Sequence, residues 1–228
     1  MQTSDRGLLA LIRHEGVVPG PYLDVKDIWT FGIGHTAAAG PPDPARMTRG
    51  MPADLDAGIR EAFRIFRTDL AAYEAEVLRA VKVPLELHEF DALVSFHYNT
   101  GGIATAALTR HLNMGNRVAA AAAFMGWLRP AVIRSRREAE RDLFAKGRYP
   151  IGTIPVWTVD RNGRVDFSRP VRRLSETEAL ALLRPIPNPP SIPISPAPST
   201  AAADPAHVQA VPSLTTRILA FLKTLIGA

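Results

Sequence analysis

Apolar residues recur every three or four positions along most of the first 150 residues, which predicts a mainly helical domain. The longest such run indicates a long amphipathic helix, and its apolar positions are Ile59, Phe63, Phe66, Leu70, Tyr73 and Val77. Shorter runs predict helices over residues 5–15, 90–98, 104–113, 118–127 and 134–146. Ser4 is suited to cap the first of these helices, and Gly16 is suited to end it.

Two segments have the composition of strands. Residues 17–36 place glycines between β-branched and aromatic residues, which is typical of short twisted strands joined by tight turns. Residues 153–167 predict a hairpin with its turn at Asp160–Gly163. A last helix is expected to start from a capping box of Ser175 and Glu178. The pattern therefore predicts an α+β fold, mainly helical, with a small β-hairpin lobe.

Proline marks the boundary of this globular part. Nine of the 20 prolines fall within residues 185–212, which predicts an extended linker after a domain of residues 1–184. Residues 150–184 are expected to be an added hairpin and helix at the end of that domain. Residues 213–228 predict a short amphipathic helix that binds an anionic membrane or lipopolysaccharide, or else folds back on the domain. Its apolar face would hold Leu214, Ile218, Leu222 and Leu225.

Charge and composition narrow the function only slightly. There are 27 Lys and Arg against 22 Asp and Glu, and the net charge of +5 suits nucleic acid, anionic lipid or bacterial wall polymers equally. The chain has no cysteine, which excludes disulfides, a Cys-ligated zinc site and a thiol nucleophile. Charged residues interrupt the apolar run at the N-terminus and no apolar stretch reaches 18 residues, so neither a signal peptide nor a transmembrane helix is expected.

Two carboxyl side chains are the candidates for chemistry. Glu15 is expected at the C-terminus of the first helix, where the helix dipole and apolar neighbours disfavour a charged carboxylate and suit a general acid. Asp24 lies in the glycine-rich segment and is expected to stay ionised. Enzymes that cleave glycosidic bonds usually use a pair of carboxyl groups of this kind. The Thr30 hydroxyl is suited to hold a water. On spacing alone, a solvated surface is much the commoner environment for both carboxyl groups.

The residues around this pair carry a resemblance. The segment from Glu15 to Thr36 resembles the active-site segment of phage-type lysozymes (endolysins) of glycoside hydrolase family 24, in which Glu, Asp and Thr follow with eight and five residues between them. The resemblance continues in residues 90–101, 108–115 and 136–144. The turn 25–28 lacks the glycine that the family usually has there, so a reshaped hairpin is expected.

The resemblance implies a two-lobed lysozyme-like fold and hydrolysis of the β-1,4 bond between N-acetylmuramic acid and N-acetylglucosamine in peptidoglycan. Glu15 would be the general acid, Asp24 would position water or stabilise positive charge on the sugar, and Thr30 would support that water. We favour an inverting mechanism, for which the two carboxyl groups lie about 6.5–9.5 Å apart. The substrate contacts expected in addition are Tyr22, Gly34, His35 and Asn99.

The biological expectation is a monomeric endolysin that acts on peptidoglycan and needs no cofactor, metal or nucleic acid. It would wait in the host cytoplasm for a membrane lesion and then reach the periplasm and cell wall. One alternative is a lytic transglycosylase, which uses a single Glu, so the presence of Asp24 argues against it. The other is a non-catalytic protein that binds the wall or builds the virion, against which the complete set of Glu15, Asp24 and Thr30 argues.

The densest charge cluster holds Arg134, Arg136, Arg137 and Arg141. One interpretation is a salt bridge from an arginine to Glu15, and another is attraction to the anionic wall. For most of the four we expect a solvated basic face.

The histidine and tryptophan residues also have both structural and functional interpretations. We expect His35 to be a structural hydrogen-bond donor and His14 to point away from the site. His88-Glu89 lacks the second histidine of a zinc helix, so no metal site is expected there. Trp127 and Trp157 line either a sugar cleft or the core, and the core is the commoner environment.

Overall fold

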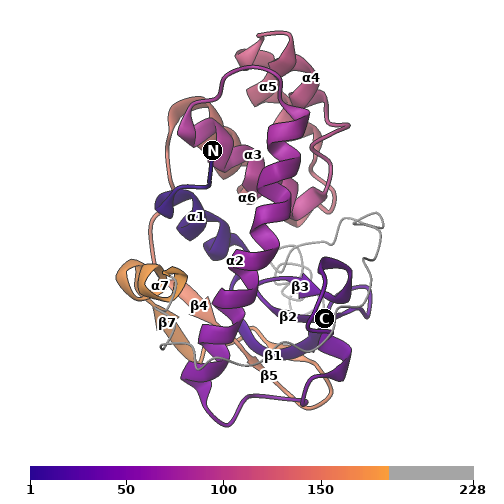
Figure 1. The fold of residues 1–228 in the computed structure, drawn as a ribbon, viewed down its shortest axis with the longest axis vertical. Coiled ribbons are helices and arrows are strands. Elements are labelled where there is room, and N and C mark those ends of the chain that lie inside the picture. Colours follow the sequence, from indigo (N-terminus) through magenta and orange to yellow (C-terminus); the bar gives the residue numbers. More distant parts are fainter. Residues whose placement is uncertain (185–228) are drawn as a thin grey trace, which may run out of the picture.

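A long helix, α2 (Leu55–Ala80), runs between a helical lobe and a small β lobe (Figure 1). In this computed structural model residues 1–184 are described, and the predicted linker 185–212 and amphipathic segment 213–228 lie outside them. Over the described residues, the two-lobed, mainly helical α+β fold predicted from the sequence is confirmed. Within residues 1–184, none of the helices combines the length and apolar character needed to cross a bilayer.

The first helix, α1 (Asp5–Glu15), leads into the β lobe. Its N-terminus is capped as predicted, because the Ser4 hydroxyl accepts a hydrogen bond from the backbone N–H of Gly7. Its C-terminus is closed by Gly16, which has a φ of 70° and donates its N–H to the carbonyl of Ile12. The chain then turns directly into the first strand.

The β lobe is a three-stranded antiparallel sheet of β1 (Val18–Leu23), β2 (Trp29–Gly32) and β3 (His35–Thr36), in that order. The pairing of β1 with β2 is irregular between Val18 and Tyr22, where Pro19 and Pro21 have no N–H to donate. In the turn between β1 and β2, Asp27 has a φ of 58°, a conformation that glycine usually supplies and aspartate tolerates, and a hairpin reshaped relative to the family stays a prediction.

The helical lobe is built around α3 (Leu87–Thr100), which is buried from Glu89 to Asn99. Helix α6 (Arg134–Lys146) packs along it, and aromatic rings of Phe96, Phe124 and Trp127 meet edge to face in the same core. The lobe is completed by α4 (Ala107–Asn113) and α5 (Arg117–Ala123). Trp127 is partly buried and packs on this core, whereas Trp157 is buried in a second, smaller cluster with Tyr22.

Several predicted helix boundaries are wrong, and the helix expected over 90–98 spans Leu87–Thr100. The helix expected over 118–127 ends at Ala123, and a 3₁₀ turn over Phe124–Gly126 follows, in which the Phe124 ring is buried against Phe96. The helix expected from residue 104 begins at Ala107, because Ala106 has an extended backbone (φ −64°, ψ 143°) that separates the helix from a turn in which the N–H groups of residues 105 and 106 donate to the carbonyl of Gly102.

Residues 150–184 form an added segment at the end of the described chain. Its inner hairpin pairs β5 (Thr158–Val159) with β6 (Val165–Asp166), with the turn where it was predicted. The hairpin is longer than predicted, because β4 (Ile154–Val156) pairs with β7 (Arg172–Leu174), beyond the expected end at residue 167. The predicted capping box at Ser175 is confirmed, and it starts α7 (Glu176–Leu183). The added segment packs against α1, α2 and β1.

Candidate active site

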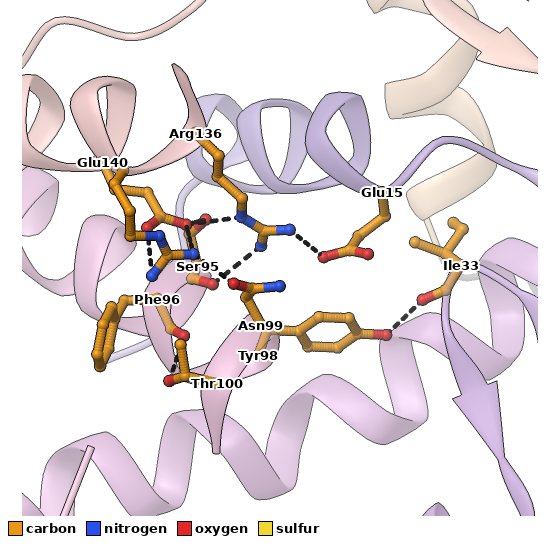
Figure 2. Close-up of polar contacts among 10 residues, drawn as sticks. Glu15, Ile33, Ser95, Phe96, Tyr98, Asn99, Thr100, Arg136 and Glu140 are labelled. Carbon is orange, nitrogen blue, oxygen red and sulfur yellow. Dashed lines mark hydrogen bonds and ion pairs between the residues drawn. The ribbon is translucent and has the colours of Figure 1, made fainter. Parts of the chain in front are cut away.

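Glu15 is the last residue of α1 and is fully buried. Its Oε1 accepts a hydrogen bond from Nη1 of Arg136 at 2.6 Å, across 121 residues of sequence. Figure 2 shows the guanidinium of Arg136 lying between Glu15 and Glu140. The salt bridge from an arginine to Glu15, one of the interpretations from the sequence, is therefore confirmed.

Arg136 is held in this position by α3 and by its own helix. Its Nε donates to Oε1 of Glu140 at 2.8 Å, and its Nη2 donates to the carbonyl of Ser95 at 3.0 Å. The Ser95 hydroxyl donates to the same Glu140 oxygen at 2.8 Å. Burial alone lowers the pKa of Arg136, but the charges of Glu15 and Glu140 outweigh it and the net shift is upward. The guanidinium therefore stays charged and fixes the direction of the Glu15 carboxyl.

Arg137 is buried beside this pair. Its Nη2 donates to Oδ1 of Asn99 at 2.5 Å, and its Nη1 lies 2.9 Å from Oε2 of Glu140. Burial lowers its pKa to about 10, although the charge of Glu140 acts in the opposite direction. We call the set of Glu15, Ser95, Asn99, Arg136, Arg137 and Glu140 the buried ion network.

A solvated basic face was expected for most of the α6 arginines. That prediction is wrong for Arg136 and Arg137, whose side chains are fully buried, and right for Arg134, whose side chain is 62% exposed. The reason is the inward face of α6, which holds Arg136, Arg137, Glu140, Leu143 and Phe144. An arginine and a glutamate four residues apart resemble a surface pair, but here both face α3.

Asp24 follows β1 directly and is held by the backbone of its own turn. Its Oδ1 accepts N–H groups of Lys26 at 2.7 Å and Ile28 at 2.9 Å. The Thr30 hydroxyl donates to the carbonyl of the same Ile28 at 3.1 Å, and the N–H of Asp24 also donates to that carbonyl. The turn therefore ties Asp24 and Thr30 to one backbone unit, and both side chains are buried.

Tyr98 connects the helical lobe to the β lobe. Its hydroxyl donates to the carbonyl of Ile33 at 2.5 Å, as Figure 2 shows. Gly34 has a φ of 88°, and a Cβ there would lie 3.5 Å from the Tyr98 ring. Burial, and after it the negative charges of Asp69 and Glu15, raise the pKa of Tyr98 well above its ordinary value. The phenol therefore stays protonated and remains a donor.

His35 makes a second connection between the lobes. Its Nδ1 lies 2.9 Å from Oδ2 of Asp69 on α2, and its Nε2 lies 2.8 Å from the carbonyl of Pro42. Burial lowers the pKa of His35, but the hydrogen bond and charge of Asp69 and the Pro42 carbonyl outweigh it and raise the pKa overall. The Asp69 carboxylate and the Pro42 carbonyl can only accept hydrogen bonds from the two ring nitrogens. The ring is therefore a structural hydrogen-bond donor, as the sequence predicted.

The other predicted substrate contacts lie in the framework around the site. Tyr22 is fully buried and packs with Val18, Trp157 and Val159. The Asn99 amide is used by Arg137, and the His35 ring is used by Asp69. Contact of Tyr22, Gly34, His35 and Asn99 with substrate stays a prediction.

Several residues of the site were not predicted. Glu140, Ser95 and Tyr98 hold the site together, and among them only Ser95 carried a signal, because it lies four residues before the predicted contact Asn99 on the same face of α3. Asp69 had a similar signal as a buried acid on the apolar face of α2. Within residues 1–184, no group of three or more His, Asp and Glu side chains is arranged to hold a metal ion.

Comparisons with known proteins agree with this architecture. The chain is 35% identical over 150 residues to the endolysin of Salmonella phage P22, a match covering 63% of this chain and 98% of that protein. The structure is similar to the endolysin from Escherichia coli O157:H7 phage FAHEc1, with a TM-score of 0.56, 28% identity, and coverage of 66% and 97%. It is also similar to the muramidase domain of SpmX from Asticcacaulis excentricus, with a TM-score of 0.52, 25% identity, and coverage of 64% and 98%.

The segment that holds the candidate residues is also the segment that matches a family model. Residues 12–140 match the model described as phage lysozyme, which is more than half of the 228 residues. This range includes Glu15, Asp24 and Thr30 together with Arg136 and Glu140. The chain belongs to the phage lysozyme family.

Proposed function

We propose that this protein hydrolyses the β-1,4 bond between N-acetylmuramic acid and N-acetylglucosamine in peptidoglycan. The observation that carries the proposal is the pair of Glu15 and Asp24, each held by contacts that fix its carboxyl group: Glu15 by Arg136 and Asp24 by the backbone of its turn. Membership of the phage lysozyme family supports a peptidoglycan substrate, and a relative in fold is itself a muramidase domain.

In this proposal Glu15 is the general acid. It gives its proton to the oxygen of the leaving sugar while the bond from that oxygen to the anomeric carbon breaks. Arg136 acts as a positioning residue, because its guanidinium sets the direction of the Glu15 carboxyl and is itself anchored to Ser95 and Glu140.

Asp24 and Thr30 act on water. We assign to Asp24 the activation of the water that attacks the anomeric carbon, and to Thr30 the support of that water. This is an inverting mechanism, for which the carboxyl groups lie about 6.5–9.5 Å apart. Following the anomer formed in the first minutes of the reaction by proton NMR tests it: an α product from the β-linked substrate agrees, and a β product contradicts it.

The experiment that tests the function is clearing of a purified peptidoglycan suspension. Wild-type protein should clear it, and Glu15→Gln should clear it at least about a hundredfold more slowly, since general acid catalysis contributes roughly 10²–10⁴-fold. Glu138→Gln is a matched control on α6, because its side chain is 44% exposed and pairs only loosely with Arg134. Failure of the wild type to clear, or equal clearing by Glu15→Gln, would overturn the proposal.

Analysis of the products separates the alternatives. Hydrolysis adds water and leaves a reducing N-acetylmuramic acid end, whereas a lytic transglycosylase leaves an anhydro sugar that is lighter by one water. A non-catalytic wall-binding or virion protein would sediment with peptidoglycan and release no soluble fragments. Mass spectrometry of the supernatant therefore distinguishes all three functions.

The proposed biological role is host lysis from within, after a membrane lesion lets the enzyme reach the wall. We also propose that the segment 213–228 brings the full chain to an anionic membrane surface through one apolar face. The residues of that face are Leu214, Ile218, Leu222 and Leu225. Sedimentation with liposomes containing phosphatidylglycerol should be lost in Ile218→Glu/Leu222→Glu, and unchanged sedimentation would refute this role.

A further inference from the structure

The added segment 150–184 lies outside the part of the chain that matches the family, which ends at residue 140. It packs along β1, which is an edge strand because the sheet order is β1-β2-β3. An edge strand has one row of backbone groups with no partner in its own sheet. The added segment supplies partners to this row at both ends of β1.

At the start of β1, the contact is made through Val17. Its N–H donates to the carbonyl of Pro155 at 3.1 Å, and its carbonyl accepts the N–H of Trp157 at 2.8 Å. Farther along, the side chains of Trp157 and Val159 pack with Tyr22 in the second apolar cluster. The added segment is thus joined to β1 by both backbone and side-chain contacts.

At the end of β1, the contact reaches the residue before Asp24. The N–H of Leu23 donates to the carbonyl of Gly163 at 2.8 Å. Gly163 has a φ of 81°, and a Cβ there would lie 2.7 Å from the ring of Trp29 and 3.1 Å from the Leu23 nitrogen. There is no room for a side chain at position 163, because the Gly163 backbone lies directly against Leu23 and Trp29. These two residues flank the turn that carries Asp24.

The turn that presents Gly163 is itself well ordered by hydrogen bonds. Oδ1 of Asp160 accepts the N–H groups of Asn162 and Arg164, each at 2.8 Å, and its own N–H donates to the carbonyl of Arg164 at 3.0 Å. This geometry holds the Gly163 carbonyl toward Leu23 before any substrate binds.

The hairpin of β1 and β2 has a specific need for outside support. Its ladder is interrupted between Val18 and Tyr22, where Pro19 and Pro21 lack an N–H, so the regularly paired part of the hairpin is short and begins only at Tyr22 and Thr30. Leu23 directly precedes Asp24, and Trp29 directly precedes Thr30. A contact that fixes Leu23 and Trp29 therefore fixes the two ends of the turn on which both predicted site residues depend.

We propose that residues 160–164 of the added segment clamp the β1–β2 hairpin and position Asp24 and Thr30 for reaction, with Gly163 as the positioning residue. This inference rests on the muramidase function proposed above. The clamp acts on the placement of the water-activating groups, while the buried ion network around Glu15 does not involve it.

The test compares two glycines of the added segment that share a positive φ. Gly163→Ala should lower kcat by roughly tenfold to a hundredfold with little change in KM, because a displacement of about 1 Å in a reacting group has effects of this size. Gly152 has a φ of 130° and nothing within 4 Å of its Cβ position, so Gly152→Ala strains the backbone of the same segment without touching Leu23 or Trp29. It should keep the wild-type kcat.

Kinetics are measured on soluble peptidoglycan fragments, well below the melting temperature of each variant. Gly163→Ala/Trp29→Phe provides a rescue, since phenylalanine lacks the outer indole atoms, Cζ3 and Cη2, that the alanine Cβ would meet. It should recover part of the lost kcat. If Gly163→Ala does not fold, Asp160→Ala tests the clamp in its place, because it removes the hydrogen bonds that order the same turn at an exposed position. This variant should lower kcat about threefold.

The outcomes separate the clamp from the function on which it rests. An active wild type, with Gly163→Ala and Asp160→Ala both at the wild-type kcat, overturns the clamp and leaves the muramidase function intact. An equal loss in Gly152→Ala would show general loosening of the segment and would also overturn it. A wild type that does not cleave peptidoglycan removes the function and the clamp together.

Discussion

The two predicted catalytic carboxyls are held in place by opposite means. Glu15 depends on charged side chains that are distant in sequence, namely Arg136 and, through it, Glu140. Asp24 depends on backbone N–H groups within four residues of itself. A charge network is lost when one member is removed, whereas a turn tolerates most side-chain changes because its donors belong to the backbone. The helical side of the site should therefore be the more sensitive to substitution.

The largest effect should come from breaking the buried ion network. Arg136→Ala leaves the carboxyls of Glu15 and Glu140 buried without the guanidinium between them, and removal of one partner of a buried pair costs about 3–5 kcal/mol. We expect the free energy of unfolding in urea to fall by this amount. Arg134→Ala, on the exposed side of the same helix, is the control and should change it by less than about 0.5 kcal/mol.

The second largest effect should come from breaking the contact between His35 and Asp69, which connects the lobes. The loss of stability should depend on pH. Because the folded-state pKa of His35 is raised above 6.5, its stabilising effect is fully present below pH 6.5 and is lost as the pH rises through the folded value. Asp69→Asn should therefore cost about 1.5–3 kcal/mol at pH 5.5 and clearly less at pH 8.5.

The difference in unfolding free energy between Asp69→Asn and wild type at each pH reports on the pair of His35 and Asp69 alone. Burial lowers the pKa values of His14 and His97, so their contributions change with pH in the opposite direction, and they cancel in the difference. Urea unfolding at the two pH values provides the measurement. A cost for Asp69→Asn that is the same at both would show that His35 does not titrate through the pair.

The hydrogen bond from Tyr98 to the β lobe should have a smaller effect. Tyr98→Phe leaves the carbonyl of Ile33 without its donor, which costs about 1–2 kcal/mol for a buried group. The thermal midpoint should fall by a few degrees, while activity at 25 °C stays close to that of wild type. A large loss of activity without loss of stability would instead give Tyr98 a direct part in the reaction.

The smallest effect should come from the turn that holds Asp24. Asp27 has a φ of 58°, which glycine adopts without strain, so Asp27→Gly should stabilise the protein by roughly 0.5 kcal/mol or leave it unchanged. Asp27→Ala should destabilise it by about 1 kcal/mol for the same reason. Both variants should keep the wild-type kcat, because the donors to Asp24 are backbone groups of Lys26 and Ile28. Loss of kcat in Asp27→Gly would contradict the view that the backbone donors of Lys26 and Ile28 are enough to orient the Asp24 carboxyl within the turn.

Local signals in the sequence predicted local structure well. The cap at Ser4, the helix end at Gly16 and the capping box at Ser175 are each encoded within four residues and are confirmed. The spacing of Glu15, Asp24 and Thr30 identified the family because it belongs to one continuous segment. The pairing of β4 with β7 was missed because short strands separated by 15 residues leave no periodic pattern.

The site's supporting residues could not be derived in the same way. Whether Arg136 faces water or Glu15 depends on how α6 packs against α1 and α3, which are far away in the sequence. The role of Gly163 could not be predicted either, because in the sequence it resembles any other glycine in a turn. Only the structure shows its contacts with Leu23 and Trp29.

The buried ion network also affects how the protein responds to dissolved salt. The guanidinium groups of Arg136 and Arg137 and the carboxyl groups of Glu15 and Glu140 lie within a volume whose side chains are at most 1% exposed. Mobile ions screen exposed charges strongly and buried pairs much less. Any dependence of wall clearing on ionic strength should therefore arise from arginines on the outside of the molecule and leave the proton donor unaffected.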